Sequence, residues 1–237
     1  MPAKRSPDTD TETPEAKKQR FSLGTNIIIV NVGKEKIRHV LHESILIQCP
    51  FFKKCLESGM REQHEKVINL PADDPEIFSI IVEWLYTNNL RPGLDPRVSP
   101  RGYIAAEKYG IHELQNVLMD CIRAKLCDNQ TLSPRWVTTV WDTTLKGSKL
   151  RDLGLDHLHY CLATRPQSYQ APSDLPDLAL ALEYPRHMET FMADPERGLA
   201  LMFRFAEKGI SKLQNPAKVV GCVYHVHEDG EKCEKSR

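Results

Sequence analysis

The chain has 237 residues, of which 41% are hydrophobic and 27% are charged, the composition of an ordinary soluble globular protein. Lys plus Arg and Asp plus Glu both number 32, so the formal net charge is zero. A neutral chain has no global field that attracts nucleic acid or an anionic membrane, so we expect no direct binding to either.

The chain shows no export or membrane signal. Its first residues are polar and charged, so no secretory signal is expected, and the longest aliphatic run, Ile27-Ile28-Ile29-Val30, is too short to span a bilayer. The seven cysteines are odd in number and show no disulfide framework. This count predicts free thiols in a reducing compartment.

Residues 1–22 are expected to form a disordered tail, because they hold almost no apolar side chains that could offset the entropy of ordering. Two basic clusters in this tail resemble a bipartite nuclear import signal: Lys4 and Arg5, then Lys17, Lys18 and Arg20. The alternative is a solvated tail of mixed charge, because acidic residues lie inside the spacer. The expected localisation is the cytoplasm, the nucleus or both.

Residues 23–127 show strands first and helices afterwards. A run that is apolar on both faces predicts a central or covered strand at 26–32, followed by a turn and a second strand at 37–41, which together form a hairpin. Short helices are expected at 43–48 and 51–56, broken at Pro50, which lacks the amide proton that a helix interior needs. A third short strand is expected at 66–70.

Two cap-then-proline signals predict the helices that follow. Asp74-Pro75 begins a helix whose apolar side chains follow 3, 4 and 7 spacing: Ile77, Phe78, Ile81, Trp84 and Leu85. Ser99-Pro100 predicts a helix that ends near Gly110, and a further amphipathic helix is expected from His112 to Leu126. This order of elements indicates an α+β fold.

The rest of the chain shows a less regular helical pattern. Helices are expected near 133–145, 150–163, 174–182, 186–193 and 195–208, with a loop rich in Pro and Ser at 166–176. We therefore divide the chain into a tail (1–22), an α+β domain (23–127), a mainly α-helical region (128–210) and a second tail (211–237).

Four motifs between residues 42 and 111 together resemble the BTB/POZ signature. They are His42-Glu43-Ser44-Ile45-Leu46 with Cys49-Pro50-Phe51-Phe52 and Leu56; Ile68-Asn69-Leu70 with Asp73-Asp74-Pro75 and Phe78; Trp84-Leu85-Tyr86-Thr87; and Ala105-x-x-Lys108-Tyr109-Gly110-Ile111. Two positions depart from the family pattern, since Cys49 stands for a Ser and His39 for an aromatic residue.

The resemblance implies a BTB/POZ fold, which is a short three-stranded sheet with a helical cluster, followed here by a mainly α-helical C-terminal region. It also implies a protein-interaction module without catalytic activity. In addition, Leu150-Arg151-Asp152-Leu153 resembles the helical extension of BTB proteins of filamentous fungi.

The resemblance also implies candidate partner-binding residues. In BTB domains that recruit cullin-3, a hydrophobic-x-Glu element contacts the partner. By this likeness Met60 would fill a groove on a cullin helix and Glu62 would orient it, with Arg61 between them; the alternative is a plain surface loop. Ile45 and Ile47 are candidates for a homodimer face, with core packing as the alternative.

Catalytic signatures are missing from the sequence. No His-Glu pair is followed by a second His at the spacing of a zinc protease, and no Gly-x-Ser-x-Gly elbow, Walker loop or Gly-x-Gly-x-x-Gly loop is present. His42 is expected to be structural, with its ring nitrogens bonded to backbone groups. We therefore predict no enzyme, and no catalytic or cofactor-binding residues.

A set of metal-binding residue types lies near the end of the sequence, in the pattern Cys222-x-x-His225-x-His227-x5-Cys233. Two thiolates and two imidazoles suffice for a tetrahedral zinc ion. The alternative is a loose tail with incidental Cys and His residues and a short strand at 219–225. Zinc is thus the one metal that the sequence suggests.

Two functions follow. The first is a substrate adaptor for a cullin-3 type ubiquitin ligase, whose client would be held by the helical half because kelch, MATH and zinc-finger segments are missing. The alternative is a nuclear scaffold or transcription co-regulator that acts through BTB-mediated dimerisation; the sequence has no Arg-rich helix to read DNA.

Overall fold

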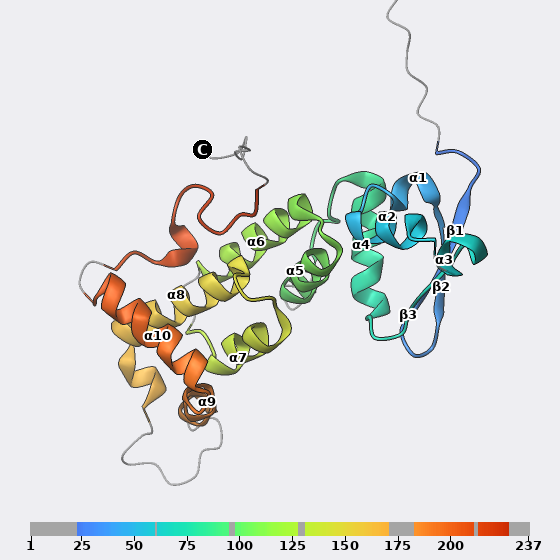
Figure 1. Ribbon diagram of the computed structural model, residues 1–237. Coiled ribbons are helices and arrows are strands. Elements are labelled where there is room, and N and C mark those ends of the chain that lie inside the picture. The colour runs from blue at the N-terminus through green and yellow to red at the C-terminus, as the bar shows by residue number, and fades with distance from the viewer. Residues whose placement is uncertain are drawn as a thin grey trace, which may run out of the picture.

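The computed structural model describes residues 23–59, 61–94, 98–127, 131–170, 183–210 and 213–227. The predicted tail at 1–22 and the predicted helix at 174–182 lie outside these residues. In the described part, a sheet with short helices forms one end of an elongated molecule and a helical bundle forms the other (Figure 1).

The sheet has three strands in the order β2-β1-β3. β1 (Ile27–Val32) and β2 (Ile37–His42) form the predicted antiparallel hairpin, and β3 (Val67–Leu70) pairs parallel with β1. Gly33 in the hairpin turn has a φ of 75°, and a Cβ there would meet the Pro75 ring at 3.1 Å. Because β1 pairs with both other strands, it is the central strand, as its apolar sequence predicts.

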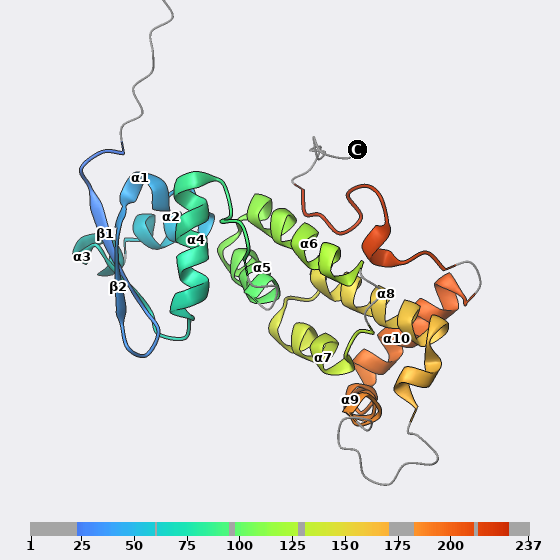
Figure 2. The ribbon, with the colours of Figure 1, turned by 180° about the vertical axis from the view of Figure 1, so that it is seen from behind.

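Three helices cover the inner face of the sheet (Figure 2): α1 (Glu43–Leu46), α2 (Pro50–Glu57) and α4 (Pro75–Thr87). α2 begins at Pro50. At the first position of a helix the backbone amide has no acceptor within the helix, so proline, which lacks this amide proton, loses no hydrogen bond there. α3 (Arg61–Glu65) is a short helix on the surface before β3.

The start of α4 confirms the cap prediction. The Asp74 carboxylate accepts hydrogen bonds from the amides of Glu76 (2.8 Å) and Ile77 (3.3 Å), which satisfies two of the donors that a helix start leaves unpaired. The carboxylate also pairs with Arg101 of the next helix.

α5 (Val98–Tyr109) and α6 (His112–Leu126) lie side by side in the middle of the molecule. The prediction that Ser99 caps α5 is wrong, because the helix already includes Val98 and Ser99 is buried in its first turn. A Cβ at Gly102 would lie 3.2 Å from Leu118, so the missing side chain lets these two helices approach closely.

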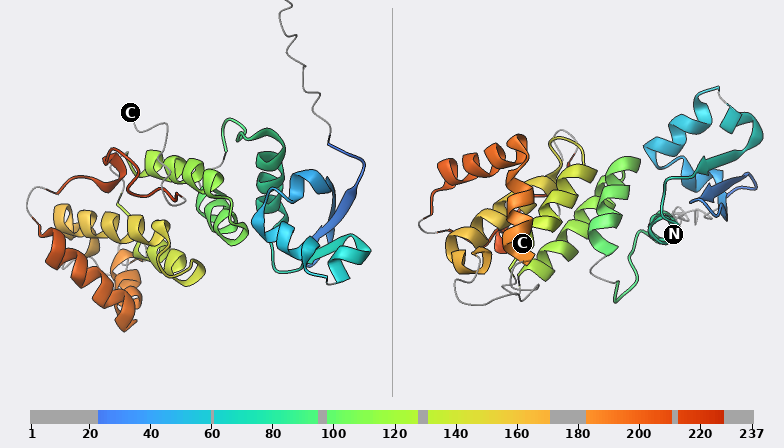
Figure 3. Two further views of the ribbon diagram at one scale, coloured as in Figure 1. Left: turned by 45° about the horizontal axis from the view of Figure 1, so that its top comes forward. Right: turned by 90° about the horizontal axis from the view of Figure 1, so that it is seen from below.

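The described residues of the helical half form four further α-helices (Figure 3): α7 (Pro134–Thr143), α8 (Lys149–Thr164), α9 (Glu183–Met192) and α10 (Pro195–Lys208). The predicted loop at 166–176 begins with a 3-10 turn, η1 (Pro166–Tyr169), and its residues 171–176 lie outside the described part of the chain.

Residues 213–227, which we call the strap, run along α6 and α8 (Figure 1). The strap contains a 3-10 turn, η2 (Pro216–Lys218). The short strand predicted at 219–225 is not formed in the strap. Side chains of α6 bind its backbone groups in place of a neighbouring strand.

The main apolar core lies between the sheet and α4 and includes the side chains predicted for it, all of them buried: Leu46, Phe52, Phe78, Trp84 and Leu85. This cluster continues past residue 127 to α7, α8 and the strap, through Val140, Leu150, Leu153 and Tyr224. A second cluster around Phe191 and Leu158 holds the far helices together. Among the described residues, no helix has the length and apolar character needed to cross a membrane.

Candidate functional site

The sequence motifs of the N-terminal half hold the sheet and helices together. The Lys108 ammonium lies 2.6 Å from the Asp73 carboxylate, and the Tyr109 hydroxyl donates to the same carboxylate at 3.0 Å. Burial, with the Asp73 charge adding to it, raises the pKa of Tyr109, so the hydroxyl stays protonated and keeps donating. This pair fixes the end of α5 against the loop before α4.

His42 is structural, but its partner differs from the one predicted. Its Nδ1 atom lies 2.9 Å from the Tyr86 hydroxyl, and its backbone amide donates to the same hydroxyl at 3.0 Å. The expectation that both ring nitrogens bond backbone groups is therefore wrong for Nδ1. The end of α4 brings Tyr86 edge-on to the imidazole, with ring centroids 6.0 Å apart.

The predicted cullin-contact element lies partly within the described residues. Met60 lies outside them. Arg61 and Glu62 form the first turn of α3, with Arg61 exposed and bonded to Glu65 at 2.5 Å and Glu62 half-buried. The two described residues thus occupy a surface position, as a docking element requires.

The outer face of the sheet carries apolar side chains. Pairing places Ile29 beside Val40 and Ile27 beside His42 on the face opposite the buried core. Ile27 is 52% exposed and Val40 is 53% exposed, so this face keeps apolar area open to a partner.

The two residues that the sequence suggests for a dimer face, Ile45 and Ile47, differ in burial. Ile45 is buried in the core, so the expectation that it forms part of a dimer face is wrong, and core packing holds for it. Ile47 follows α1 and stays exposed. The short helix ends between the two positions, and they therefore do not share a face.

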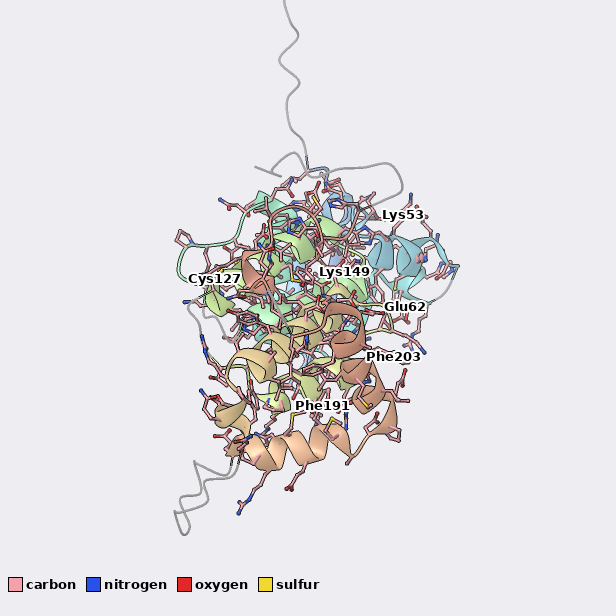
Figure 4. All side chains as sticks on the ribbon, turned by 90° about the vertical axis from the view of Figure 1, so that its left-hand side faces the viewer. Lys53, Glu62, Cys127, Lys149, Phe191 and Phe203 are labelled. Atoms are coloured by element: carbon pink, nitrogen blue, oxygen red, sulfur yellow. The ribbon has the colours of Figure 1, made fainter. Side chains whose placement is uncertain are left out.

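α10 presents a second apolar surface. Leu199, Met202 and Phe203 follow i, i+3 and i+4 spacing and are 53%, 60% and 63% exposed, respectively. Figure 4 shows Phe203 on the outer side of the helical half. We call these three residues the α10 stripe. Burying a large apolar side chain contributes about 1.5–3 kcal/mol, so three exposed side chains on one helix face are informative.

The inner face of α10 is instead fixed by ion pairs. Arg197 lies 2.9 Å from Asp142 of α7, and Arg204 lies 2.6 Å from Asp152 and 3.2 Å from Asp156 of α8. These contacts orient the helix so that the α10 stripe faces outward.

The strap is anchored to α6 and α8 by its backbone and by one aromatic ring. The Asn116 side chain donates to the Val226 carbonyl at 2.9 Å and accepts from the Val226 amide at 2.7 Å. Arg123 donates to the Val219 carbonyl. The buried Tyr224 hydroxyl donates to Asp156 at 2.7 Å.

Three of the four predicted metal ligands come together. One ligand atom each from Cys222, His225 and His227 lies within 4.8 Å of the other two, and all three residues are partly buried. Cys233 lies outside the described residues. A carboxylate that the sequence analysis did not include, Asp120 of α6, lies 2.9 Å from Nε2 of His225.

A cavity of about 340 Å³ lies beneath the strap, between α8, α10 and η2. Asp156, His159, Lys208 and Tyr224 line it; Lys208 lies 2.7 Å from Asp156, and His159 bonds the Gly209 carbonyl at 2.9 Å. Burial lowers the pKa of His159, which keeps its ring neutral near pH 7. Asp156 joins Tyr224 of the strap to Lys208 of α10, so the groups that line the cavity form part of the anchor of the strap.

Residues 25–126 match the family model of the BTB/POZ domain. The chain therefore contains a BTB/POZ domain, a protein–protein interaction module that is generally not enzymatic, and a helical region follows it. Among curated proteins, none matches the chain. The resemblance of residues 150–153 to fungal BTB proteins stays a prediction; these residues lie in α8.

The α10 stripe was not predicted from the sequence. Its signal was present, because residues 199–206 carry apolar side chains on more sides of the helix than one neighbour can bury. Asp120 was missed for another reason, since 105 residues separate it from His225 and no local pattern joins them.

Proposed function

We propose that the protein is an adaptor with two docking surfaces, in which the BTB/POZ domain binds one protein and the α10 stripe binds a client. The observation that carries this proposal is the orientation of α10. Its cationic side chains face inward to aspartates, while Leu199, Met202 and Phe203 face outward. The stripe and the sheet lie at opposite ends of the molecule (Figure 3), so two partners can bind together.

The stripe suits a partner with an apolar groove. Exposed side chains at i, i+3 and i+4 are the pattern by which one helix enters a hydrophobic groove on another protein. Aromatic residues often dominate such contacts, so we assign Phe203 as the anchor.

Quantitative affinity capture with the full chain tests the client surface. The native protein is compared with Phe203→Ser and with the matched control Glu207→Gln, an exposed position on the same helix. A set of partners lost with Phe203→Ser and kept with Glu207→Gln supports the proposal. Identical partners in all three samples contradict it, provided circular dichroism shows that the variants fold.

For the BTB/POZ domain we propose a cullin-3 type ubiquitin ligase as the partner. The surface position of Arg61 and Glu62 in the first turn of α3 supports it, together with the hydrophobic-x-Glu sequence. Purified cullin-3 should bind the native chain and fail to bind Met60→Ala combined with Glu62→Ala. Lys53→Ala, which changes an exposed side chain of α2, is the control. If native protein does not bind cullin-3, this part of the proposal is wrong, and the client test above is unaffected.

The alternative function is a nuclear scaffold or co-regulator that acts as a homodimer. The basic clusters in residues 1–22 favour it, and they also suggest that the protein enters the nucleus. A fluorescent reporter fused to these residues should accumulate in the nucleus. An evenly distributed reporter would contradict nuclear import through this tail.

A further inference from the structure

We propose that Cys222, His225 and His227 bind a zinc ion, and that the bound ion stabilises the docked strap against α6 and α8. This inference does not depend on the adaptor function. It rests on the geometry of the three ligands, on the carboxylate beside one of them, and on the residue placed between them.

The backbone brings the three ligands together. The His225 amide donates to the Cys222 carbonyl at 3.1 Å, which closes a tight turn and places the two side chains near each other. His227 follows by two residues, and side chains at i and i+2 of a non-helical segment can share one side. The His225 and His227 ring centroids lie 6.1 Å apart.

The ligand set suits zinc. One thiolate and two imidazoles are among the ligand types that zinc takes in a tetrahedral site, and their ligand atoms already lie within 4.8 Å of one another. Small movements of side chains would bring them to a common ion. The fourth position is left for water.

Asp120 adds a second, independent feature. Its carboxylate lies 2.9 Å from Nε2 of His225. Histidines that bind metal commonly donate their other ring N–H to a carboxylate, which fixes the tautomer and orients the ring. With Nε2 directed at Asp120, Nδ1 of His225 is the atom that would face the metal.

The residue between the ligands connects the metal to the core. Tyr224 lies between Cys222 and His225 in sequence, and its buried hydroxyl donates to Asp156 at 2.7 Å. An ion that holds Cys222 and His225 fixes the turn from which Tyr224 enters the core. Val226 lies between the two histidines, and the Asn116 side chain bonds both its backbone amide and its backbone carbonyl.

Metal content and a spectroscopic probe test the binding step. Full-length protein, freed of any affinity tag, should carry about one equivalent of zinc. Cobalt substitution should give a thiolate-to-cobalt absorption band, which Cys222→Ser removes. Cys55→Ser, a partly buried thiol in α2, is the matched control and should keep both signals. Asp120→Ala should weaken zinc binding roughly 10-fold.

Hydrogen exchange tests the coupling to the strap. Removal of zinc with a chelator should speed amide exchange in residues 213–227 and leave the exchange of α2 unchanged. The same chelator should have no effect on Cys222→Ser. If the native protein carries no zinc, or if the Cys222→Ser variant keeps the full signal, the proposed zinc site is wrong. Zinc that binds without slowing exchange in the strap overturns its stabilising role.

Discussion

The hydrogen bond between Tyr224 and Asp156 gives the most direct measure of how firmly the strap is held. Tyr224→Phe removes a hydroxyl that donates to a buried carboxylate at 2.7 Å. A hydrogen bond to a charged group contributes about 1.5–3 kcal/mol, so we expect the free energy of unfolding to fall by about 2 kcal/mol. Asp156 keeps Lys208 and Arg204 as partners in this variant, so no unpaired charge is added.

Asp156→Ala should have a larger effect. The Lys208 side chain is 41% exposed and can turn to water, and Arg204 keeps its contact with Asp152. The buried Tyr224 hydroxyl, however, loses its acceptor. Breaking a buried charged network costs about 3–5 kcal/mol. Because Lys208 can be hydrated and Arg204 keeps Asp152 as a partner, we expect a loss of stability near the lower end of this range, at about 3 kcal/mol.

A double-mutant cycle separates this bond from the other effects. In the Asp156→Ala background, Tyr224→Phe should cost nothing, because the bond is already gone and the hydroxyl that it removes has lost its acceptor. The coupling energy should therefore be at least about 2 kcal/mol. Urea unfolding near neutral pH, followed by circular dichroism at one fixed metal content, measures all four proteins. Additivity within about 0.5 kcal/mol would refute the reasoning, because it would mean that the strap is not anchored through this pair.

Three further predictions concern the BTB/POZ domain. Asp74→Ala should lower the free energy of unfolding by about 1 kcal/mol, and Asp74→Asn by less, since the amide oxygen can still cap α4; thermal unfolding measures both. Burial, with the Glu107 charge adding to it, raises the pKa of Tyr103 to about 12. Unfolded tyrosine ionises near pH 10, so this contribution to stability is complete below about pH 10 and is lost as the pH rises towards about 12. Tyr103→Phe should therefore flatten the alkaline fall, and equal slopes in urea titrations would contradict the assignment. For the homodimer proposed as the alternative function, Val40→Glu on the outer sheet face should abolish self-association without loss of stability, as sedimentation and thermal unfolding would show; an unchanged assembly would exclude this face.

The sequence alone determined the class of the fold and most of the elements of the BTB/POZ domain. Short-range signals carry this information: the cap and proline at Asp74-Pro75, the apolar spacing through Leu85, and the run in β1 that is apolar on both faces. Each depends on neighbours within one or two helical turns, so each can be found without knowledge of the rest of the chain.

Only the tertiary structure decided which face of α10 is buried and what surrounds the Cys/His cluster. The apolar pattern of α10 allows more than one orientation, and aspartates on α7 and α8, more than 40 residues earlier in the chain, select the one that leaves Phe203 outside. In the same way, Asp120 reaches His225 only because the strap folds back onto α6. Periodicity encodes how a segment folds, whereas the partner of each face is set by residues distant in sequence, which no local pattern records.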